Sequence, residues 1–428
     1  MAQPRVDTPL ESRILPKEFY EPFISQSSNH RIEDPIRALL PLEDSPGVIS
    51  LLAGKPNSET FPITSMQFTL RDPVTGAEKP IALSEQELAK GLQYSPSAGI
   101  PELNDWLIGL QEYSHGRKRG EGWGLCFGTG SSDLIYKVVN ALLDPGDVAL
   151  IEAPVYAGIV PMFHATRCEI IEVGGDSHGT DTKGLRELLE NWPAGKPKPK
   201  VLYTVPHNFL ILEDDPYYYL YFGDAPRPPS YFTLERDQPE VGRVIRFDSL
   251  SKVLSSGMRI GFLSAPQVII DAVILHTMTS NLQPPTLTQV LALRLLKEWG
   301  YDGLRAHVDR VAQFYHAKRD VFEGFMKKYL GGLAEWDTPE AGMFFWFKLK
   351  INEGDAGEGD SEAIIRTKAL ENGVLALPGT VCHPGGQKTA YVRASFSLLP
   401  PDQVEEALRR LRQVILDARA EAKAEKAA

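Results

Sequence analysis

The most informative segment of the sequence is Asp248-Ser-Leu-Ser-Lys-Val-Leu-Ser-Ser-Gly-Met-Arg259. It places Lys252 among serine hydroxyls, and Arg259 follows after a glycine turn. A lysine that forms an imine with an aldehyde works beside an anion-binding site, which an arginine can supply. A single lysine, taken alone, is best interpreted as a solvated surface charge. The string around Lys252 also offers a possible anion-binding site, so a lysine that forms an imine is a second interpretation.

The composition predicts a protein with two folded domains and a small-molecule function. The chain has 428 residues, 43% of them hydrophobic, which is enough for two cores. Its net charge of -11 argues against nucleic-acid and membrane-surface partners. The three cysteines lack the spacing of a zinc site or a disulfide framework, so no metal site and a reducing compartment are expected. Without a secretory signal or an apolar run of membrane-spanning length, the chain is expected to be cytoplasmic.

Apolar runs alternate with segments of helical period from Val48 to about Pro266. Residues 148–152, 169–173 and 201–205 have the pattern of strands, and residues 132–143 that of a helix. This alternation predicts an α/β fold with a mostly parallel central sheet. We expect an N-terminal arm, a large domain that includes one half of a long helix pair, and a smaller α+β domain. Their predicted ranges are residues 1–48, 49–320 and 321–428, with the helix pair at 284–330.

Two further segments carry polar residues where such sheets bind ligands. Gly128-Thr-Gly-Ser-Ser132 precedes a helix, and its small residues let backbone N–H groups approach a phosphate. A loop that merely caps the helix is an equally good interpretation. Asp215 follows an apolar strand, and ligands bind at the carboxyl ends of parallel strands. An aspartate before Pro216 can also simply cap a turn.

These segments together resemble the fold-type-I aminotransferases, which use pyridoxal 5'-phosphate. Arg259 and Gly261 complete the family's lysine motif, and Glu213-Asp-Asp-Pro-Tyr-Tyr218 matches its E-D-D-P-Y-Y string. The resemblance extends from about Ser25 to Leu416, and it is greatest to kynurenine/α-aminoadipate and fungal aromatic aminotransferases. It implies that Lys252 carries the cofactor, Asp215 holds the ring nitrogen and Tyr218 donates to the phenolic oxygen. The implied contacts to the rest of the cofactor are Ser131, Ser132, Ser249, Ser251 and Arg259.

The resemblance also implies contacts from other parts of the chain. Tyr156 stacks on the cofactor ring, and Tyr94 reaches the phosphate of a partner subunit, so the active site is shared in a homodimer. Arg393 grips the substrate carboxylate with its planar guanidinium, which lysine could not do in the same way. The remaining substrate contacts are implied for Arg31, Phe344 and Gly54. From the residues alone, Tyr156 and Phe344 could also be core aromatics, and Arg393 could form a surface ion pair.

One part of the family pattern is missing. The family continues from the strand of residues 201–205 through an N-P-T-G segment and a full helix, whereas here Val205-Pro-His-Asn208 runs directly into Phe209. Parallel neighbours need a crossover of about a dozen residues or more, so a tight hairpin is expected. The first strand could be displaced, the strands could pair antiparallel and disturb Asp215 and Tyr218, or the chain could be a defective form that never folds stably. Loss of the helix layer is expected to expose apolar sheet at a cost on the order of several kcal/mol, and His207 is expected to be an ordinary loop residue.

The expected reaction is transamination of an aromatic amino acid, kynurenine or 2-aminoadipate with a 2-oxo acid such as 2-oxoglutarate. Two alternatives remain open. One is another pyridoxal-phosphate reaction on the same scaffold, such as β-elimination. The other is a catalytically impaired or inactive variant, for which the missing segment is the evidence.

Overall fold

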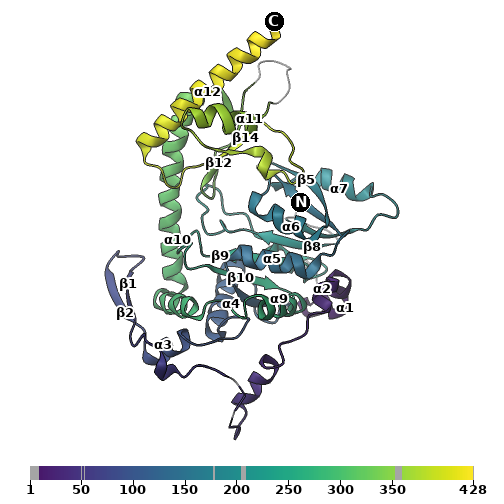
Figure 1. Cartoon of the computed structure of the whole chain (residues 1–428), viewed down its shortest axis with the longest axis vertical. Coiled ribbons are helices and arrows are strands. Elements are labelled where there is room, and N and C mark those ends of the chain that lie inside the picture. Colours follow the sequence, from purple (N-terminus) through teal and green to yellow (C-terminus); the bar gives the residue numbers. More distant parts are fainter. Residues whose placement is uncertain are drawn as a thin grey trace.

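The computed structural model describes residues 9–49, 51–52, 54–176, 179–203, 209–351 and 359–427. It contains a large α/β body, a smaller upper part that includes the C-terminus, and an N-terminal arm (Figure 1). The predicted α/β class is confirmed. The domain boundaries given above remain predictions.

The body is built on an eight-stranded sheet in the order β3-β10-β9-β8-β7-β4-β5-β6. The five strands from β9 to β5 in this order are parallel, whereas β10 is antiparallel to both of its neighbours and β6 is antiparallel to β5. Every residue of β9 and β10 is buried, as expected for a sheet that is covered on both faces. The strands are β3 (Gly124–Thr129), β4 (Val148–Ala153), β5 (Glu169–Asp176), β6 (Gly179–Thr180), β7 (Pro199–Tyr203), β8 (Leu210–Asp214), β9 (Val244–Ser249) and β10 (Ile260–Ala265).

Helices cover the two faces of this sheet. Helices α5 (Ser131–Leu142), α6 (Val160–Thr166) and α9 (Gln267–Ser280) pack on one face, and α4 (Pro101–His115) and the first part of α10 (Thr286–Leu330) pack on the other. The local sequence explains the ends of α4: Pro101 starts it, and Gly116 ends it in the left-handed conformation. Smaller helices complete the body, namely α3 (Glu85–Gly91), α7 (Thr182–Glu190) and α8 (Tyr231–Leu234).

The smaller part has a core of its own. Its antiparallel sheet has the order β11-β12-β14-β13, and α12 (Pro401–Ala427) and the second part of α10 pack against it. Gly300 interrupts α10 with non-helical backbone, so the predicted helix pair is confirmed. Figure 1 shows the second part of α10 running from the body up to α12. The other elements are β11 (Ala334–Trp336), β12 (Phe344–Leu349), α11 (Ser361–Ile364), β13 (Leu377–Pro378) and β14 (Tyr391–Ser395).

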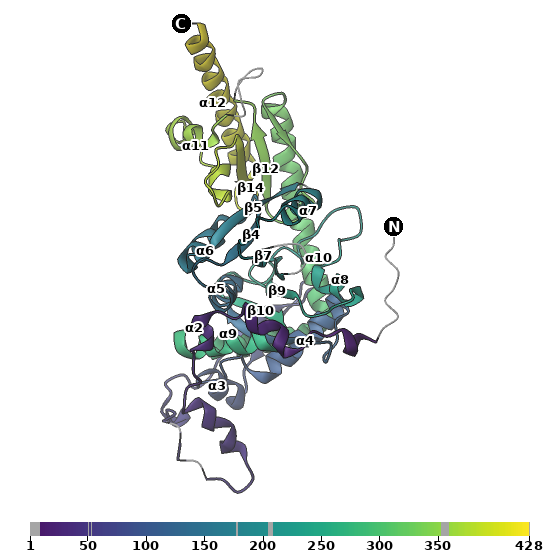
Figure 2. The same cartoon turned by 90° about the vertical axis from the view of Figure 1, so that its right-hand side faces the viewer.

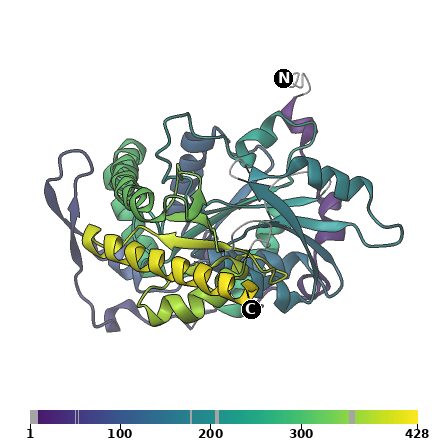
Figure 3. The ribbon, with the colours of Figure 1, turned by 90° about the horizontal axis from the view of Figure 1, so that it is seen from above.

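The N-terminal arm contains short helical turns, including α1 (Lys17–Tyr20) and α2 (Gln26–Asn29), and then leaves the body (Figure 2). The hairpin of β1 (Gln67–Arg71) and β2 (Glu78–Ala82) also projects outward, as the view from above shows (Figure 3). In the structure this arm continues past residue 48, and its apolar side chains Ile49 and Leu51 are almost fully exposed, at 92% and 99%. In a single chain this apolar surface has no covering.

The pairing of β7 and β8 contradicts the expected hairpin. The two strands are parallel, with Val201 opposite Leu210 and Tyr203 opposite Leu212, and β7 keeps its place between β8 and β4. In this register Tyr203 and Phe209 are about 11 Å apart, and the six Cα–Cα steps between them can span about 20 Å. Residues 204–208, which include His207 and Asn208, lie outside the described residues.

The expected exposure of apolar sheet is also wrong for these two strands. Val201, Leu202, Leu210 and Leu212 are each fully buried. Phe209 packs in a cluster with Leu150, Val173, Leu185 and Leu202, and the partly buried Trp192 and Tyr231 lie against that cluster. Side chains from neighbouring segments therefore cover the strands on either side of the short connection.

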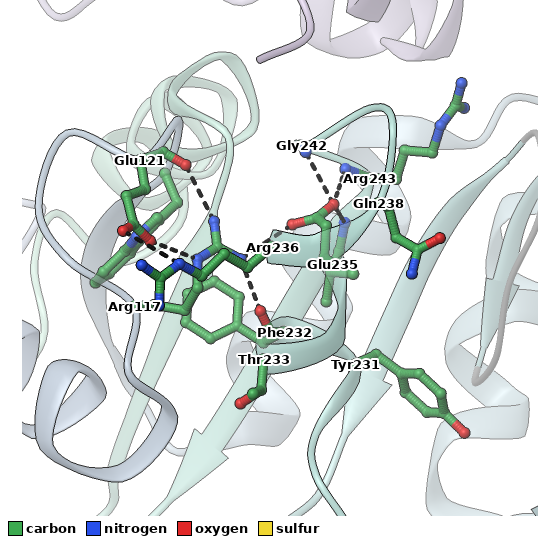
Figure 4. A network of polar contacts seen from close by, with 12 residues as sticks. Arg117, Glu121, Tyr231, Phe232, Thr233, Glu235, Arg236, Gln238, Gly242 and Arg243 are labelled. Atoms are coloured by element: carbon green, nitrogen blue, oxygen red, sulfur yellow. Dashed lines mark hydrogen bonds and ion pairs between the residues drawn. The ribbon is translucent and has the colours of Figure 1, made fainter. Parts of the chain in front are cut away.

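A buried polar network fixes the opposite, amino-terminal end of the strands. Arg117, which is 1% exposed, pairs with Glu121 and Glu235 and donates to the carbonyl of Phe232 (Figure 4). Glu235 in turn accepts from the backbone N–H of Gly242 and of the next two residues, where β9 begins. Because these charges satisfy one another within the network, it is best interpreted as structural.

Candidate active site

The carboxyl ends of the central strands bring most of the predicted site residues to one edge of the sheet. Thr129, Tyr203, Asp214 and Ser249 are the last residues of β3, β7, β8 and β9. Asp214 lies opposite Phe247, and Ser249 lies opposite Gly261 in β10. This is the edge at which sheets of this kind bind ligands.

An arginine and a helix N-terminus meet at this edge. Ser131 and Ser132 begin α5, and the Arg259 guanidinium lies so close to Gly130 that a Cβ there would come within 2.3 Å of its Nη2 atom. A Cβ on Gly261 would likewise meet the Gly130 and Ser131 backbone, at 2.4 Å from the Gly130 carbonyl carbon. Arg259 itself has φ of 54°, which is uncommon outside glycine and typical of functional sites. Two positively polarised groups held this close together are suited to an anion between them.

The lysine lies in the turn between β9 and β10, next to this anion cradle. Ser249 Oγ accepts a hydrogen bond of 3.2 Å from the backbone N–H of Ser251, which shapes the start of the turn. Lys252 is half-buried, and no ion pair to its ammonium group occurs within the described ranges. The pairing of Ser249 with Gly261 brings this turn beside the cradle.

Asp214, the last residue of β8, and Tyr217, three residues further on, have related surroundings. Tyr203 donates a hydrogen bond of 2.5 Å to Asp214 Oδ2, while Asp214 Oδ1 is buried and has no partner among the described residues. Burial is the main cause that raises the pKa of Asp214 to about 6. Burial also raises the pKa of Tyr217 to about 12, with Tyr156 and Asp214 adding to the effect and Arg393 opposing it. Tyr156, Asp214 and Arg393 therefore all lie within electrostatic range of Tyr217.

The other side of β8 holds two of the predicted catalytic residues in different surroundings. Tyr218 donates a 3.0 Å hydrogen bond to the carbonyl of Ser114, and the Arg227 guanidinium lies 4.4 Å from its ring centre. Burial raises the pKa of Asp215 to about 6, and the charge of Arg246 opposes this rise. The described contacts thus tie Asp215 and Tyr218 to a polar network and do not join either of them to Tyr156.

The small part contributes an arginine and an aromatic wall. Arg393 in β14 lies 4.2 Å from the ring centre of Phe344, the first residue of β12. Phe344 in turn meets the ring of Tyr217 edge to face, with 6.2 Å between ring centres. The structure therefore brings Arg393, Phe344 and Tyr217 together, as the sequence analysis expected for the first two.

The remaining predicted residues lie elsewhere in the single chain. Tyr156 is half-exposed and is one of the groups that raise the pKa of Tyr203. Tyr94, also half-exposed, lies within electrostatic range of Arg37, whose pKa is lowered by burial while Asp34 and Tyr94 oppose that fall. Arg31 donates to Ser28 and lies near Tyr136 and His276, on the outer side of α5 and α9. Gly54, in the arm, is exposed. The structure does not bring Tyr94, Arg31 or Gly54 to the rest of the site within one chain.

Sequence reasoning missed Tyr203, Asp214 and Tyr217. Side chains alternate between the two faces of a strand, and the even-numbered Leu210 and Leu212 belong to one core cluster whereas Ile211 belongs to another. By the same alternation, Asp214 shares the face of Tyr203, and Asp215 shares the face of Glu213. This period was the signal that could have separated the two aspartates.

Comparisons with known proteins identify the family of this chain. The Aspartate amino-transferase family model matches residues 199–427, and the Aminotransferase class I and II model matches residues 73–208. Aminotransferase tdiD of Emericella nidulans is 42% identical over 402 residues, which cover 88% of this chain and 91% of that protein. The mitochondrial kynurenine/alpha-aminoadipate aminotransferase of Bos taurus is 38% identical and covers 92% of this chain and 99% of its own length. The fold is similar to that of aminotransferase Aro8 from Candida albicans, with a TM-score of 0.81 and 22% identity over 92% of this chain and 98% of that one.

The fold and the site define a fold-type-I transferase that depends on pyridoxal 5'-phosphate. The chain belongs to the class I and II aminotransferase family, and it is a transaminating enzyme. The residues present fit the cofactor: Gly130 and Gly261 leave a cradle that a Cβ would fill, with Arg259 against it. Among the buried oxygens that lack partners in the described part, Thr129 Oγ1 and Asp214 Oδ1 lie at the carboxyl ends of β3 and β8, and Asp214 offers a carboxylate suited to a ring nitrogen. No helix in the described ranges has the length and apolar character needed to cross a membrane.

Proposed function

We propose that the amino donor is an aromatic amino acid, kynurenine or 2-aminoadipate, and that the acceptor is a 2-oxo acid such as 2-oxoglutarate. The observation that carries this proposal is the position of the Arg393 guanidinium, 4.2 Å from the Phe344 ring centre. A planar cation beside an aromatic wall suits a ligand with a carboxylate and a flat apolar side chain. The names of the relatives point to the same donors.

The roles within the site follow the two sides of β8. The cofactor supplies the electron sink when it is bound. Lys252 holds it and moves the proton at the substrate Cα as base and acid. We assign the contact with the ring nitrogen to Asp214 and not to Asp215, because Asp214 Oδ1 is buried and unpartnered in the described structure. By the same reasoning Tyr217, next to Asp214 and Phe344, replaces Tyr218 as the donor to the phenolic oxygen.

The phosphate and ring contacts stay with the residues that the sequence predicted. Ser131, Ser132 and Arg259 bind the phosphate, supported by the contact of Arg259 with the start of α5. Ser249 and Ser251 shape the lysine turn. Tyr156 stacks on the ring.

The working enzyme is proposed to be a cytoplasmic homodimer with a shared active site. Tyr94 is 54% exposed in the single chain, and the apolar arm that includes Gly54 is uncovered. A second copy that covers the arm would give Tyr94, Arg31 and Gly54 access to the neighbouring site. Amino acid biosynthesis or breakdown is the expected setting.

An impaired or inactive form of the same enzyme is the second candidate, and the short connection after Tyr203 favours it. In the family that this chain resembles, the asparagine of the N-P-T-G segment bonds to the phenolic oxygen of the cofactor, and this segment is missing here. The test is to incubate the purified chain with pyridoxal phosphate, 2-oxoglutarate and single amino acids, and to follow glutamate and the new oxo acid by mass spectrometry. Glutamate formed in step with loss of an aromatic donor supports the proposal, and ammonia without glutamate indicates elimination instead. Absence of products from every donor would leave the inactive form.

A further inference from the structure

Tyr203 has no contact with the cofactor in the proposed assignment, but it donates a hydrogen bond to Asp214, the residue proposed to contact the cofactor. We propose that Tyr203 is a positioning residue, whose hydroxyl fixes Asp214 Oδ2 so that Oδ1 is presented to the ring nitrogen. This inference rests on the proposed role of Asp214. It adds a specific function for β7, the strand that precedes the shortened connection.

The geometry of the pair is well defined. Tyr203 Oη donates to Asp214 Oδ2 at 2.5 Å, and Oδ1 of the same carboxylate is buried without a partner in the described chain. Each residue is the last of its strand, and the register of β7 on β8 sets Tyr203 opposite Leu212, two residues before Asp214. The hydrogen bond is therefore a diagonal cross-strand contact on one face of the sheet.

The phenol is itself held in place. Tyr203 is 5% exposed and belongs to the main core cluster, and the ring of Phe163 in α6 packs on it edge to face at 6.0 Å. A donor that cannot rotate away restricts the carboxylate to one orientation. Because the Asp214 side chain is already oriented, binding of a ligand to Oδ1 loses little conformational entropy.

The hydrogen bond also favours the charged carboxylate. Burial raises the pKa of Asp214, and the bond from Tyr203 opposes that rise. A charge-assisted bond of this type is stronger than one between neutral groups. Tyr203 therefore acts both on the direction and on the ionisation of Asp214.

The experiment compares the affinity of the purified chain for two probes, pyridoxal phosphate and its 1-deaza analogue, in which a C–H replaces the ring nitrogen. Dissociation constants are measured by absorbance titration for wild type, Tyr203→Phe, Asp214→Asn and Tyr231→Phe. Tyr231 is the matched control, because it is a partly buried tyrosine beside β8 that is outside the proposed machinery. The readout is the ratio of the two dissociation constants, which a general loss of stability does not change.

Wild type and Tyr231→Phe are expected to prefer pyridoxal phosphate, and Asp214→Asn to lose that preference. Tyr203→Phe is expected to reduce the preference about tenfold, the effect of one hydrogen bond to a charged group. If Asp214→Asn keeps the wild-type preference, the assignment of Asp214 itself is wrong. If Asp214→Asn loses it while Tyr203→Phe keeps it in full, only the role of Tyr203 is overturned.

A second variant keeps the test decisive if Tyr203→Phe does not fold. Site-specific 3-fluorotyrosine at position 203 preserves the size of the ring and makes the hydroxyl a stronger donor. It is expected to maintain or increase the preference for pyridoxal phosphate. A fall to the ratio of Asp214→Asn would contradict the proposal.

Discussion

Two aspartates and two tyrosines at the end of β8 have different surroundings: Asp214 and Tyr217 form one pair, and Asp215 and Tyr218 form the other. Asp214 has one oxygen bound by Tyr203 and the other without a partner in the described structure, and Tyr217 faces Phe344 and Arg393. One residue further along, Asp215 faces the charge of Arg246, and the Tyr218 hydroxyl is bonded to the backbone. The two neighbouring aspartates thus have different contacts, and so do the two neighbouring tyrosines.

The difference shows how a sheet separates binding from support. On the far side, Arg246 is 0% exposed and pairs with Glu213 at 3.0 Å and with Asp248 at 2.9 Å. Removing one member of such a buried group typically lowers the free energy of unfolding by about 3–5 kcal/mol, because the remaining buried charges lose their partner. On the side of Asp214, the Oδ1 atom of this carboxylate is buried without a hydrogen-bond partner in the described structure, which leaves it available to a ligand.

The largest expected effect concerns the lysine between the two sides. Lys252→Ala should abolish transamination and all cofactor that stays attached after borohydride reduction, because no other described residue is placed to replace its amine. Peptide mass spectrometry of the reduced protein measures this directly. Lys183→Ala is the control, since the Lys183 side chain is 87% exposed on α7. Label on another lysine of the Lys252→Ala protein would refute the assignment.

The paired aspartates provide the next largest contrast. Asp214→Asn should lower kcat by about 10²–10³-fold, the usual effect of losing one preorganised electrostatic group. Asp215→Asn should change kcat by less than about tenfold and act mainly on stability through the Arg246 network. Steady-state kinetics and urea unfolding of both variants separate the two effects. The reverse order of kcat losses would restore Asp215 as the catalytic residue.

The substrate arginine should affect binding of the amino acid and not of the cofactor. Arg393→Lys loses the bidentate geometry, so KM for the donor should rise about 10–100-fold while the affinity for pyridoxal phosphate stays unchanged. Arg409→Lys on the exposed face of α12 is the matched control. Equal losses of both affinities would show that Arg393 supports the fold and does not contact the substrate.

The tyrosine pair gives the smallest expected difference. Tyr217→Phe should reduce kcat about tenfold through one lost hydrogen bond, with little change in stability. Tyr218→Phe removes the bond to Ser114 and should cost about 1 kcal/mol of unfolding free energy with kcat preserved. Activity assays and chemical denaturation on the same preparations distinguish these patterns. Loss of kcat in Tyr218→Phe alone would exchange the two roles.

Much of this site could be predicted from the sequence because its motifs are local. The lysine turn with Arg259 and the glycine-serine loop each lie within about a dozen consecutive residues, and the strands around them are continuous apolar runs. The choice between Asp214 and Asp215 was not accessible in this way, because it depends on strand register, and a shift by one residue reverses every side chain. The hairpin prediction failed for a related reason. It took the first strand to continue to Val205, whereas β7 ends at Tyr203 and pairs with β8 in parallel.

We propose that the side of the sheet with Asp214 and Tyr217 remains a cofactor site despite the short connection after Tyr203. The most direct test is a titration of the purified wild-type chain with pyridoxal phosphate, followed by absorbance and by size-exclusion chromatography on the same sample. We expect the fraction that contains the folded dimer to show the absorption band of the protein-bound cofactor. Aggregation, or cofactor that elutes only as the free compound, would contradict it.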